Sequence, residues 1–361
     1  MKKKSLLIYI PSVEGGGVEK FLYLITNYFI KKKLKVIIIT AFNCKKKYIN
    51  KKAKIVSLKH NHNLIKSRFI RNLISVFLFF KHYWKDNITI FSLQSNITAI
   101  ILSLISNKRI IIRSNTSPDK YIKNSLKKFI FRFFFNFADK IIVNSYEFKK
   151  RFKNFFSISP IVIYNPFIKK NVKKVYFNFF NDKKFLRIIN IGRLTDQKDH
   201  LTLLRAVKKL DKYRKFRLTI IGRGYREKLL RKYISENKLQ EKVRMIGYRE
   251  NADSYIRDSD IFVLPSIYEG APNVLLESIF LKKYVISADC PTGPKEILNN
   301  GKYGDLFKSG DHNQLFKLLK NFNKNSPKVK YKVTQGYKSL ARFDYRTNCE
   351  KYFQIISKYL R

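Results

Sequence analysis

The chain has 361 residues, 45% of them hydrophobic, and its 76 Lys and Arg against 25 Asp and Glu give a formal net charge of +51. This length exceeds what one hydrophobic core usually serves, and the composition excludes a disordered or fibrous protein, so two globular domains are expected. The charge favours anionic partners, which include nucleic acid, phosphate-bearing substrates and acidic membrane surfaces, although a general richness in residues with AT-rich codons explains part of it.

The three cysteines, Cys44, Cys290 and Cys349, lie far apart and match neither a zinc-site spacing nor the disulfide framework of a small secreted protein. This pattern favours a reducing cytoplasm. The apolar run 6–10 is too short for a signal peptide, and the run 73–80 falls short of the roughly 20 residues that cross a membrane. We therefore expect no transmembrane segment.

Short β-branched runs alternate with longer amphipathic segments, which predicts parallel sheets with crossover helices. The first set of predicted strands comprises 6–10, 36–40, 88–91, 110–112, 141–143 and 161–163. The alternation breaks after Asn165-Pro166, and the second set comprises 186–191, 218–221, 243–246, 261–264 and 285–288. The chain is thus predicted to be an α/β protein of two doubly wound domains.

A glycine cluster, Gly15-Gly16-Gly17, follows the first predicted strand and opens a segment with helical spacing of apolar residues. Glycines at such a place let the backbone approach a phosphate at a helix N-terminus. A tight structural turn explains them equally well, and the cluster is not the dinucleotide-binding pattern G-x-G-x-x-G.

A second loop, Gly192 to Lys198, follows the first strand of the second domain and precedes a helix that begins near His200. Arg193 offers a planar fork of donors and Lys198 a point charge, and the two together suit a diphosphate. In a chain this basic, a solvated surface loop is the alternative.

The segment Tyr268 to Glu277 places two carboxylates, Glu269 and Glu277, after the strand 261–264. Because Pro272 favours the first turn of a helix, Glu269 is expected in a loop and Glu277 within the helix that follows. Amides at a helix start bind anions, and carboxylates accept pairs of hydrogen bonds from vicinal hydroxyls. One segment is therefore able to bind phosphate, ribose and sugar.

With these motifs the chain resembles a family 4 glycosyltransferase of the GT-B fold, two Rossmann-like domains facing across a cleft. The resemblance covers nearly the whole length and rests on the segments 16–19, 192–198, 221–224, 246–248, 259–266, 269–277 and 289–296. We expect an acceptor-side domain at 1–168 and a donor-binding domain at 169–346. A C-terminal helix at about 347–361 is expected to pack on the first domain.

The resemblance implies a role for individual residues. Arg193 and Lys198 would hold the donor diphosphate and stabilise its departure, Glu269 would contact hydroxyls of the transferred sugar, and Glu277 would bind the ribose. The other implied donor-binding residues are Gly16, Gly17, Gly192, Gly247, Tyr248, Gly270, Ala271, Pro272, Asn273 and Val274. The reaction would retain anomeric configuration without a metal or a cofactor, and the leaving phosphate would help to accept the proton of the acceptor.

The acceptor side departs from the family pattern, because the candidate region 92–96 has no His where many relatives carry one near the reacting sugar. Arg113 and Asn115, after the next strand, are candidate contacts to a lipid-linked diphosphate, and a loop-ordering role for Arg113 is the alternative. Asp258-Ser259-Asp260 is expected to be structural rather than a metal site. His60 and His62 have no plausible third ligand and are expected at the surface.

The sequence thus predicts transfer of a hexose or N-acetylhexosamine, from a donor that the resemblance makes UDP-linked, to a polyprenyl-diphosphate-linked saccharide of a bacterial polysaccharide, lipopolysaccharide or capsule. Aromatics mixed with cations in the segment 120–156 predict peripheral docking on the anionic inner face of the cytoplasmic membrane, and the alternative is that half of the stripe is a core-facing helix. The alternatives are a nucleic-acid-binding protein, which lacks a recognised module, and a GT-B phosphorylase or epimerase.

Overall fold

The structure, a computed structural model, describes residues 5–13, 16–42, 48–58, 67–115, 118, 122, 124–169, 171–172, 177–182 and 184–360. Four positions considered above lie outside the described residues, namely Gly15, Cys44, His60 and His62. The chain folds into two compact units. Unit 1 comprises Met1–Pro166 and Phe343–Arg361, and unit 2 comprises Phe167–Arg342.

Unit 1 contains, within its described residues, a seven-stranded parallel sheet. The strands are β1 (Ser5–Tyr9), β2 (Lys35–Phe42), β3 (Lys54–Leu58), β4 (Thr89–Ser92), β5 (Ile110–Arg113), β6 (Lys140–Val143) and β7 (Ile161–Val162). Their order is β3-β2-β1-β4-β5-β6-β7. Six match the predicted runs to within two residues. Strand β3 has no predicted counterpart because it lies at the sheet edge with half-buried side chains and lacks a continuous apolar run.

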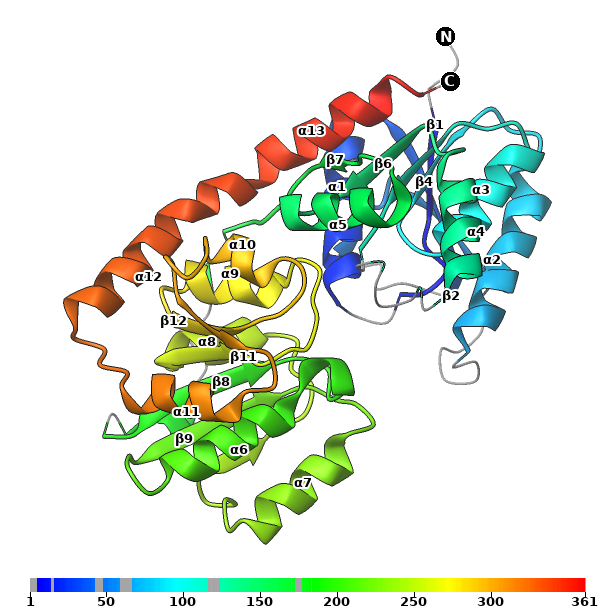
Figure 1. Ribbon diagram of the computed structural model, residues 1–361. Helices are drawn as coiled ribbons and strands as arrows, with labels where there is room; N and C mark the ends of the chain where they lie inside the picture. The colour runs from blue at the N-terminus through cyan, green and yellow to red at the C-terminus, as the bar shows by residue number, and fades with distance from the viewer. Residues whose placement is uncertain are drawn as a thin grey trace. The chain divides into compact units, whose positions relative to one another are not determined.

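Helices cover both faces of this sheet (Figure 1). On one face lie α1 (Gly17–Lys31) and α13 (Tyr345–Ser357), whose Phe21 and Tyr352 meet edge to face in the core. The other face carries α2 (Arg68–Tyr83), α3 (Asn96–Ile105), α4 (Ser125–Phe135) and α5 (Tyr146–Phe156). Burial of apolar side chains on both faces explains why most of these strands are nearly continuous runs of Ile, Leu, Val and Phe.

Unit 2 contains, in the residues the structure describes, a six-stranded parallel sheet. The strands are β8 (Leu186–Ile191), β9 (Phe216–Ile221), β10 (Val243–Met245), β11 (Ile261–Leu264), β12 (Tyr284–Asp289) and β13 (Asp305–Lys308). Their order is β10-β9-β8-β11-β12-β13. Strand β13 has no predicted counterpart, because its four residues begin and end with charged side chains.

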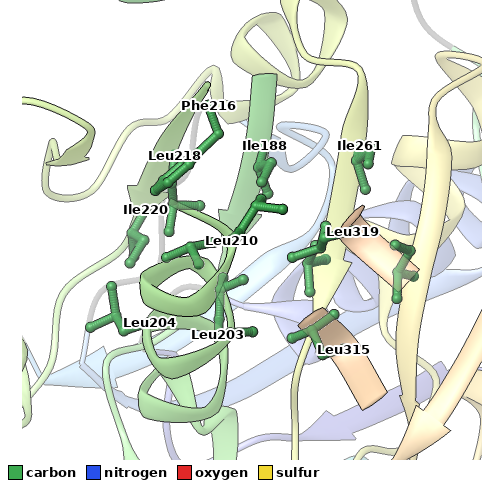
Figure 2. Close-up of a cluster of buried hydrophobic side chains, with 14 of the residues drawn as sticks. Ile188, Leu203, Leu204, Leu210, Phe216, Leu218, Ile220, Ile261, Leu315 and Leu319 are labelled. Atoms are coloured by element: carbon green, nitrogen blue, oxygen red, sulfur yellow. The ribbon is translucent and has the colours of Figure 1, made fainter. Parts of the chain in front are cut away.

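One face of the second sheet is covered by α6 (His200–Leu210), α7 (Glu227–Glu236) and α11 (His312–Lys320). Figure 2 shows the leucines of α6 and α11 turned toward the strands β8, β9 and β11. Helices α8 (Ala252–Asp258), α9 (Asn273–Phe280) and α10 (Pro294–Ile297) lie on the other face, and α12 (Pro327–Ser339) packs against α9 and β12. The doubly wound α/β organisation predicted for both halves is confirmed.

Strand order reverses in each sheet between the first strand and the fourth, so the loops after these two strands diverge and leave room for a ligand at the carboxyl edge. In unit 1 this place lies after β1 and β4, and in unit 2 after β8 and β11. The predicted motifs at Gly16, Gly192 and Glu269 follow three of these four strands.

Candidate functional site

The main cluster of predicted residues lies at the carboxyl edge of the second sheet, after β8 and β11. Lys198 ends a 3₁₀ turn (Asp196–Lys198) that follows β8, and Glu269 lies in the loop that follows β11. The Lys198 Nζ forms an ion pair with the Glu269 Oε1, and the two side chains are only 14% and 7% exposed. The two residues are 71 positions apart in the sequence, and they meet because β8 and β11 are paired neighbours in the sheet.

Three further hydrogen bonds fix Glu269. The Ser266 hydroxyl donates to the same Oε1 at 2.6 Å, and the Thr292 hydroxyl donates to the Glu269 carbonyl oxygen at 2.7 Å. The Glu269 amide donates to the Pro291 carbonyl oxygen at 3.0 Å. Ser266 and Thr292 are both fully buried. Neither was predicted as a site residue from the sequence, because a Ser or Thr beside a motif has no characteristic spacing of its own.

The loops after β8 and β11 are also joined to each other through Gln197. Its carbonyl oxygen accepts from the Ile267 amide at 2.9 Å, and its side-chain Nε2 donates to the Tyr268 carbonyl oxygen at 3.0 Å. The position of Lys198 relative to Glu269 is therefore set by backbone contacts as well as by the ion pair.

Arg193 lies at the other end of the same loop with an exposed side chain, and its Nη2 is 3.5 Å from the Gln197 Oε1. The loop itself is anchored by Asp196. The Tyr225 hydroxyl donates to the Asp196 Oδ2 at 2.7 Å, and Arg226 forms an ion pair with the Oδ1. The hydrogen bond from Tyr225, followed by that from Arg226, lowers the pKa of Asp196. Arg193 is thus a solvated cation on an anchored loop, and its side chain is accessible to an anion.

Glycines allow three loops to run close together at this edge. The Gly222 amide donates to the Gly247 carbonyl oxygen at 3.0 Å, and a Cβ on Gly222 would lie 1.8 Å from the Gly192 carbonyl oxygen. Gly247 itself adopts a φ of +70°, and Tyr248 beside it is exposed. The structure therefore brings the predicted residues Gly192, Gly247 and Tyr248 to the same sheet edge as Lys198.

Helix α9 begins at Asn273, directly after Pro272, which is the N-cap. Its first turn, which includes Val274, starts at the carboxyl edge of the sheet because α9 follows β11. Glu277 lies half-buried within the helix and Glu269 lies outside it, as predicted. The loop just before the helix is packed tightly, since a Cβ on Gly293 would lie 1.8 Å from the Gly270 carbonyl oxygen and 3.2 Å from the Ala271 Cα.

His200 is a further buried group beside this cluster that the motifs do not reveal. It begins α6, is 2% exposed, and neither ring nitrogen has a hydrogen-bond partner in the part of the chain that the structure describes. Burial, and then the nearby charge of Lys198, lower the pKa of His200 to about 4. The imidazole is therefore neutral at neutral pH.

In unit 1, Gly16 and Gly17 lie where the sequence predicts a phosphate-facing turn. Gly16 is the N-cap of α1 and Gly17 begins the helix, both exposed. A Cβ on Gly16 would lie 3.2 Å from the Glu19 Oε2, so glycine also leaves space for a buried carboxylate. This geometry suits both the phosphate site and the structural turn that the sequence leaves open.

Arg113 is buried, and each of its three guanidinium nitrogens donates a hydrogen bond. Its Nε donates to the Tyr352 hydroxyl at 3.0 Å, its Nη2 donates to the Asn165 Oδ1 at 2.5 Å, and its Nη1 donates to the Asn115 Oδ1. The guanidinium carbon also lies 4.0 Å from the centre of the Phe21 ring. These contacts tie β5, α1 and α13 together and favour the loop-ordering alternative over an acceptor contact.

Asp260 directly precedes β11, at the amino edge of the sheet, whereas Glu269 lies at the carboxyl edge. Its carboxylate receives a two-point contact from Arg187, with the Nη2 at 2.6 Å and the Nε at 2.9 Å. Burial acts to raise the pKa of Asp260, but the hydrogen bonds and charge of Arg187 outweigh it and the pKa is lowered. Across the described residues no group of three or more His, Cys, Asp and Glu is placed to hold a metal ion.

Two family models match the chain. Residues 15–168 match the model described as Glycosyltransferase Family 4, and residues 173–339 match the one described as Glycosyl transferases group 1. An uncharacterized glycosyltransferase of Methanocaldococcus jannaschii is 34% identical over 55% of this chain, and the chain spans about half (52%) of that relative.

A second relative has a named substrate. The N-acetylgalactosamine-N,N'-diacetylbacillosaminyl-diphospho-undecaprenol 4-alpha-N-acetylgalactosaminyltransferase of Campylobacter jejuni is 29% identical over 71% of either chain. Among solved structures, Anabaena Alr3699/HepE in complex with UDP and glucose superposes with a TM-score of 0.78 over 98% of this chain and 100% of that one, at 17% identity. This likeness confirms the GT-B fold.

Proposed function

We propose that this chain, which belongs to the family 4 glycosyltransferases, moves a hexose or N-acetylhexosamine from a nucleotide diphosphate sugar to a saccharide carried on a lipid diphosphate. The observation that supports this most directly is the buried pair of Lys198 and Glu269 at the carboxyl edge of unit 2. A cation suited to a diphosphate and a carboxylate suited to sugar hydroxyls lie side by side at the topological switch point. Unit 2 is then the donor-binding unit and unit 1 the acceptor side.

The roles divide by chemistry. Lys198 and the exposed Arg193 neutralise the two phosphates, and amides at the start of α9 add further donors. Glu269, held by Ser266, keeps its second oxygen for hydroxyls of the sugar. Glu277 binds the ribose from within α9. The turn at Gly247 and Tyr248 borders the base.

The reaction proceeds by exchange of one bond to the anomeric carbon. The bond from that carbon to the diphosphate oxygen breaks, and a bond to the acceptor hydroxyl oxygen forms on the same face. The hydroxyl proton passes to the departing phosphate, so no side chain needs to act as general base. Catalysis then rests on electrostatic stabilisation of the leaving diphosphate by Lys198 and Arg193, which supply the positive charge that a metal supplies elsewhere.

The named relatives support particular partners. The complex of Anabaena HepE with UDP and glucose supports a UDP-linked donor. The Campylobacter jejuni enzyme, named for a diphospho-undecaprenol substrate, supports a polyprenyl-diphosphate-linked acceptor. Such an acceptor is membrane-bound, so we place the protein peripherally on the inner face of the cytoplasmic membrane. The product is a cell-surface glycan such as a polysaccharide, a lipopolysaccharide or a capsule.

Thermal stabilisation across a panel of UDP, GDP and dTDP sugars tests the donor, because a ligand that binds only the folded state raises its stability. One UDP-sugar is expected to raise the Tm, and a radiolabelled form of it is expected to give a lipid-linked product. Lys198→Ala and Glu269→Ala are expected to abolish transfer, whereas Lys232→Ala on the exposed side of α7 retains it. The proposal fails if no sugar nucleotide stabilises the chain, or if salt-dependent DNA binding survives Glu269→Ala while transfer is absent from the wild type.

A further inference from the structure

Helix α2 carries apolar side chains on two opposite sides. One side packs into the core of unit 1 through Leu78, Phe79 and Tyr83. The other side is an exposed stripe at helical spacing that comprises Phe69, Leu73, Phe77, Phe80 and, just after the helix, Trp84. A surface helix normally turns polar side chains outward, so this outer stripe is unusual for a helix in contact with water.

Helix α4 repeats the arrangement and divides the predicted phenylalanine stripe in two. Phe131, Phe134 and Phe135 pack against the core, whereas the outward side carries exposed apolar residues. These are Leu126, Phe129, Ile130, Phe133 and, beyond the helix end, Phe137. Helix α3 adds a third exposed group, which comprises Ile101, Leu104 and Ile105.

The three helices cover the same face of the first sheet and adjoin one another (Figure 1). The Asn72 Nδ2 of α2 donates to the Thr98 hydroxyl of α3 at 2.9 Å, and the Lys108 Nζ after α3 donates to the Trp84 carbonyl oxygen at 2.9 Å. Helix α3 in turn packs against α4. The exposed apolar residues of α2, α3 and α4 therefore form one surface, which we call the outer apolar surface.

The charge around this surface is mainly positive, and its exposed carboxylate, Asp86, directly follows Trp84 and Lys85. Helices α2, α3 and α4 contain no Asp or Glu. Exposed cations flank the apolar stripes, namely Lys81, Lys85, Lys127, Lys128 and Arg132. The two carboxylates that follow α4 in sequence, Asp139 and Glu147, form ion pairs with Arg109 and Arg151.

Exposed apolar residues flanked by cations favour one kind of binding partner. A second copy of the chain docked by the same surface would bring its own cations against these, which disfavours a dimer. An anionic bilayer satisfies both features, because its phosphates meet the cations while its acyl boundary takes the aromatic side chains. Among the described residues no helix is long and apolar enough to cross a membrane, so the contact would be interfacial.

We propose that the outer apolar surface of α2, α3 and α4 docks unit 1 on an anionic lipid membrane. The inference rests on the proposed function in so far as a lipid-linked acceptor brings the enzyme to a bilayer. It goes further by naming the surface and by extending it from α4 to α2 and α3.

The test is co-sedimentation of the full chain with vesicles of phosphatidylcholine, with and without phosphatidylglycerol, at low and physiological salt. The test variant combines Phe77→Asp and Phe129→Asp, whose wild-type rings are 58% and 67% exposed. The matched control combines Tyr213→Asp and Tyr331→Asp in unit 2, where the rings are 60% and 62% exposed. Both variants change the net charge equally, and all four positions are exposed enough to leave the fold intact.

We expect the wild type and the control to bind vesicles that contain phosphatidylglycerol and the test variant to bind at least tenfold more weakly. Lys127→Gln is expected to weaken this binding about fivefold, as one cation near an anionic surface does. Equal binding of test and control variants, or no binding of the wild type to anionic vesicles, would overturn the proposal. So would a wild-type dimer that the test variant dissociates without change in vesicle binding.

Transfer to a detergent-solubilised acceptor separates this proposal from the proposed function. We expect the test variant to transfer sugar in detergent at the wild-type rate and to lose most transfer to acceptor embedded in vesicles. If vesicle binding depends on the surface but no sugar is transferred in any format, the docking surface stands and the enzymatic function fails. If transfer occurs and the test variant still binds vesicles normally, the docking surface alone fails.

Discussion

Lys198 and Glu269 form a nearly buried ion pair across the carboxyl ends of β8 and β11, with the Ser266 hydroxyl 2.6 Å from the same carboxylate oxygen. The pair brings opposite charges out of water at the place where a donor diphosphate is proposed to bind. Removal of one partner from such a pair leaves an uncompensated charge, whereas removal of both is less harmful.

A double-mutant cycle tests the coupling of the pair. Lys198→Met and Glu269→Gln are each expected to lower kcat/KM by about 10²- to 10³-fold, since each removes a group that acts on the sugar or its leaving diphosphate. Each is also expected to cost about 3 kcal/mol of stability, and the double variant less than the sum, by thermal unfolding without ligand. Lys232→Met, which breaks an exposed pair on α7, is the control and should cost under about 0.5 kcal/mol. Additive losses would show that the two side chains are not coupled.

Gly293→Ala is expected to destabilise unit 2 and weaken donor binding together. Gly293 has a φ of +96°, and a Cβ there would lie 1.8 Å from the Gly270 carbonyl oxygen, so the loop that carries Glu269 has to move. Gly310→Ala is the matched control, because its φ is +81° but nothing lies within 4 Å of the added carbon. Gly310→Ala should cost about 1–2 kcal/mol from backbone strain alone, and Gly293→Ala clearly more. Equal melting temperatures for the two variants would contradict the close approach.

The pH dependence of stability should carry a contribution from His200. Its folded pKa of about 4 lies below its ordinary value of 6.5, so above pH 6.5 both states are neutral and the group contributes no pH dependence. Between pH 6.5 and 4 the unfolded chain binds a proton that the folded chain refuses, so stability falls as pH falls, by about 2 kcal/mol at pH 5. His200→Leu removes this loss. Relative to the wild type, its unfolding free energy should therefore rise by that amount between pH 7.5 and 5, and a constant difference would refute the buried neutral imidazole.

Arg113→Lys separates the two roles that the sequence leaves open for this residue. Lys cannot reproduce three directed donors and the stacking on Phe21. The variant is expected to lose about 2–4 kcal/mol of stability, measured by the shift of the unfolding transition. The KM for the lipid-linked acceptor is expected to stay within about twofold of the wild type if Arg113 orders the loop. A large rise in that KM with unchanged stability would restore the acceptor contact, and Arg109→Lys at an exposed ion pair is the control.

The strand positions could be predicted because buried parallel strands require continuous apolar runs, as in 186–191 and 261–264, which match β8 and β11 residue for residue. Two of the four edge strands that the structure describes, β3 and β13, escape this signal, whereas the edge strands β7 and β10 were predicted. The side chains of β3 are at most half-buried, and β13 begins and ends with charged residues, so the sequence of either strand resembles that of a loop. The split of Glu269 and Glu277 between loop and helix was predictable from Pro272 alone, because backbone sterics act over a few residues.

The side-chain contacts of the site residues could not be predicted from the sequence. Motif spacing predicts which residue types follow a strand. It does not predict that the Lys198 ammonium contacts the Glu269 carboxylate. Nor does it predict that Arg113 donates hydrogen bonds to Asn115, Asn165 and Tyr352. Those contacts join segments far apart in the chain and depend on strand order.

The amino-acid sequence by itself determined the α/β class, the two-part organisation, most strands and the family motifs, because each depends on local periodicity and local sterics. Only the tertiary structure decided that Glu269 is held by Lys198 and Ser266, that His200 is buried and neutral, and that the aromatic side chains of α2 and α4 divide between core and surface. The physical reason is that burial and pairing are properties of neighbours in space. The pairing of β8 with β11 brings Lys198 to Glu269, although the two residues lie 71 positions apart in the sequence.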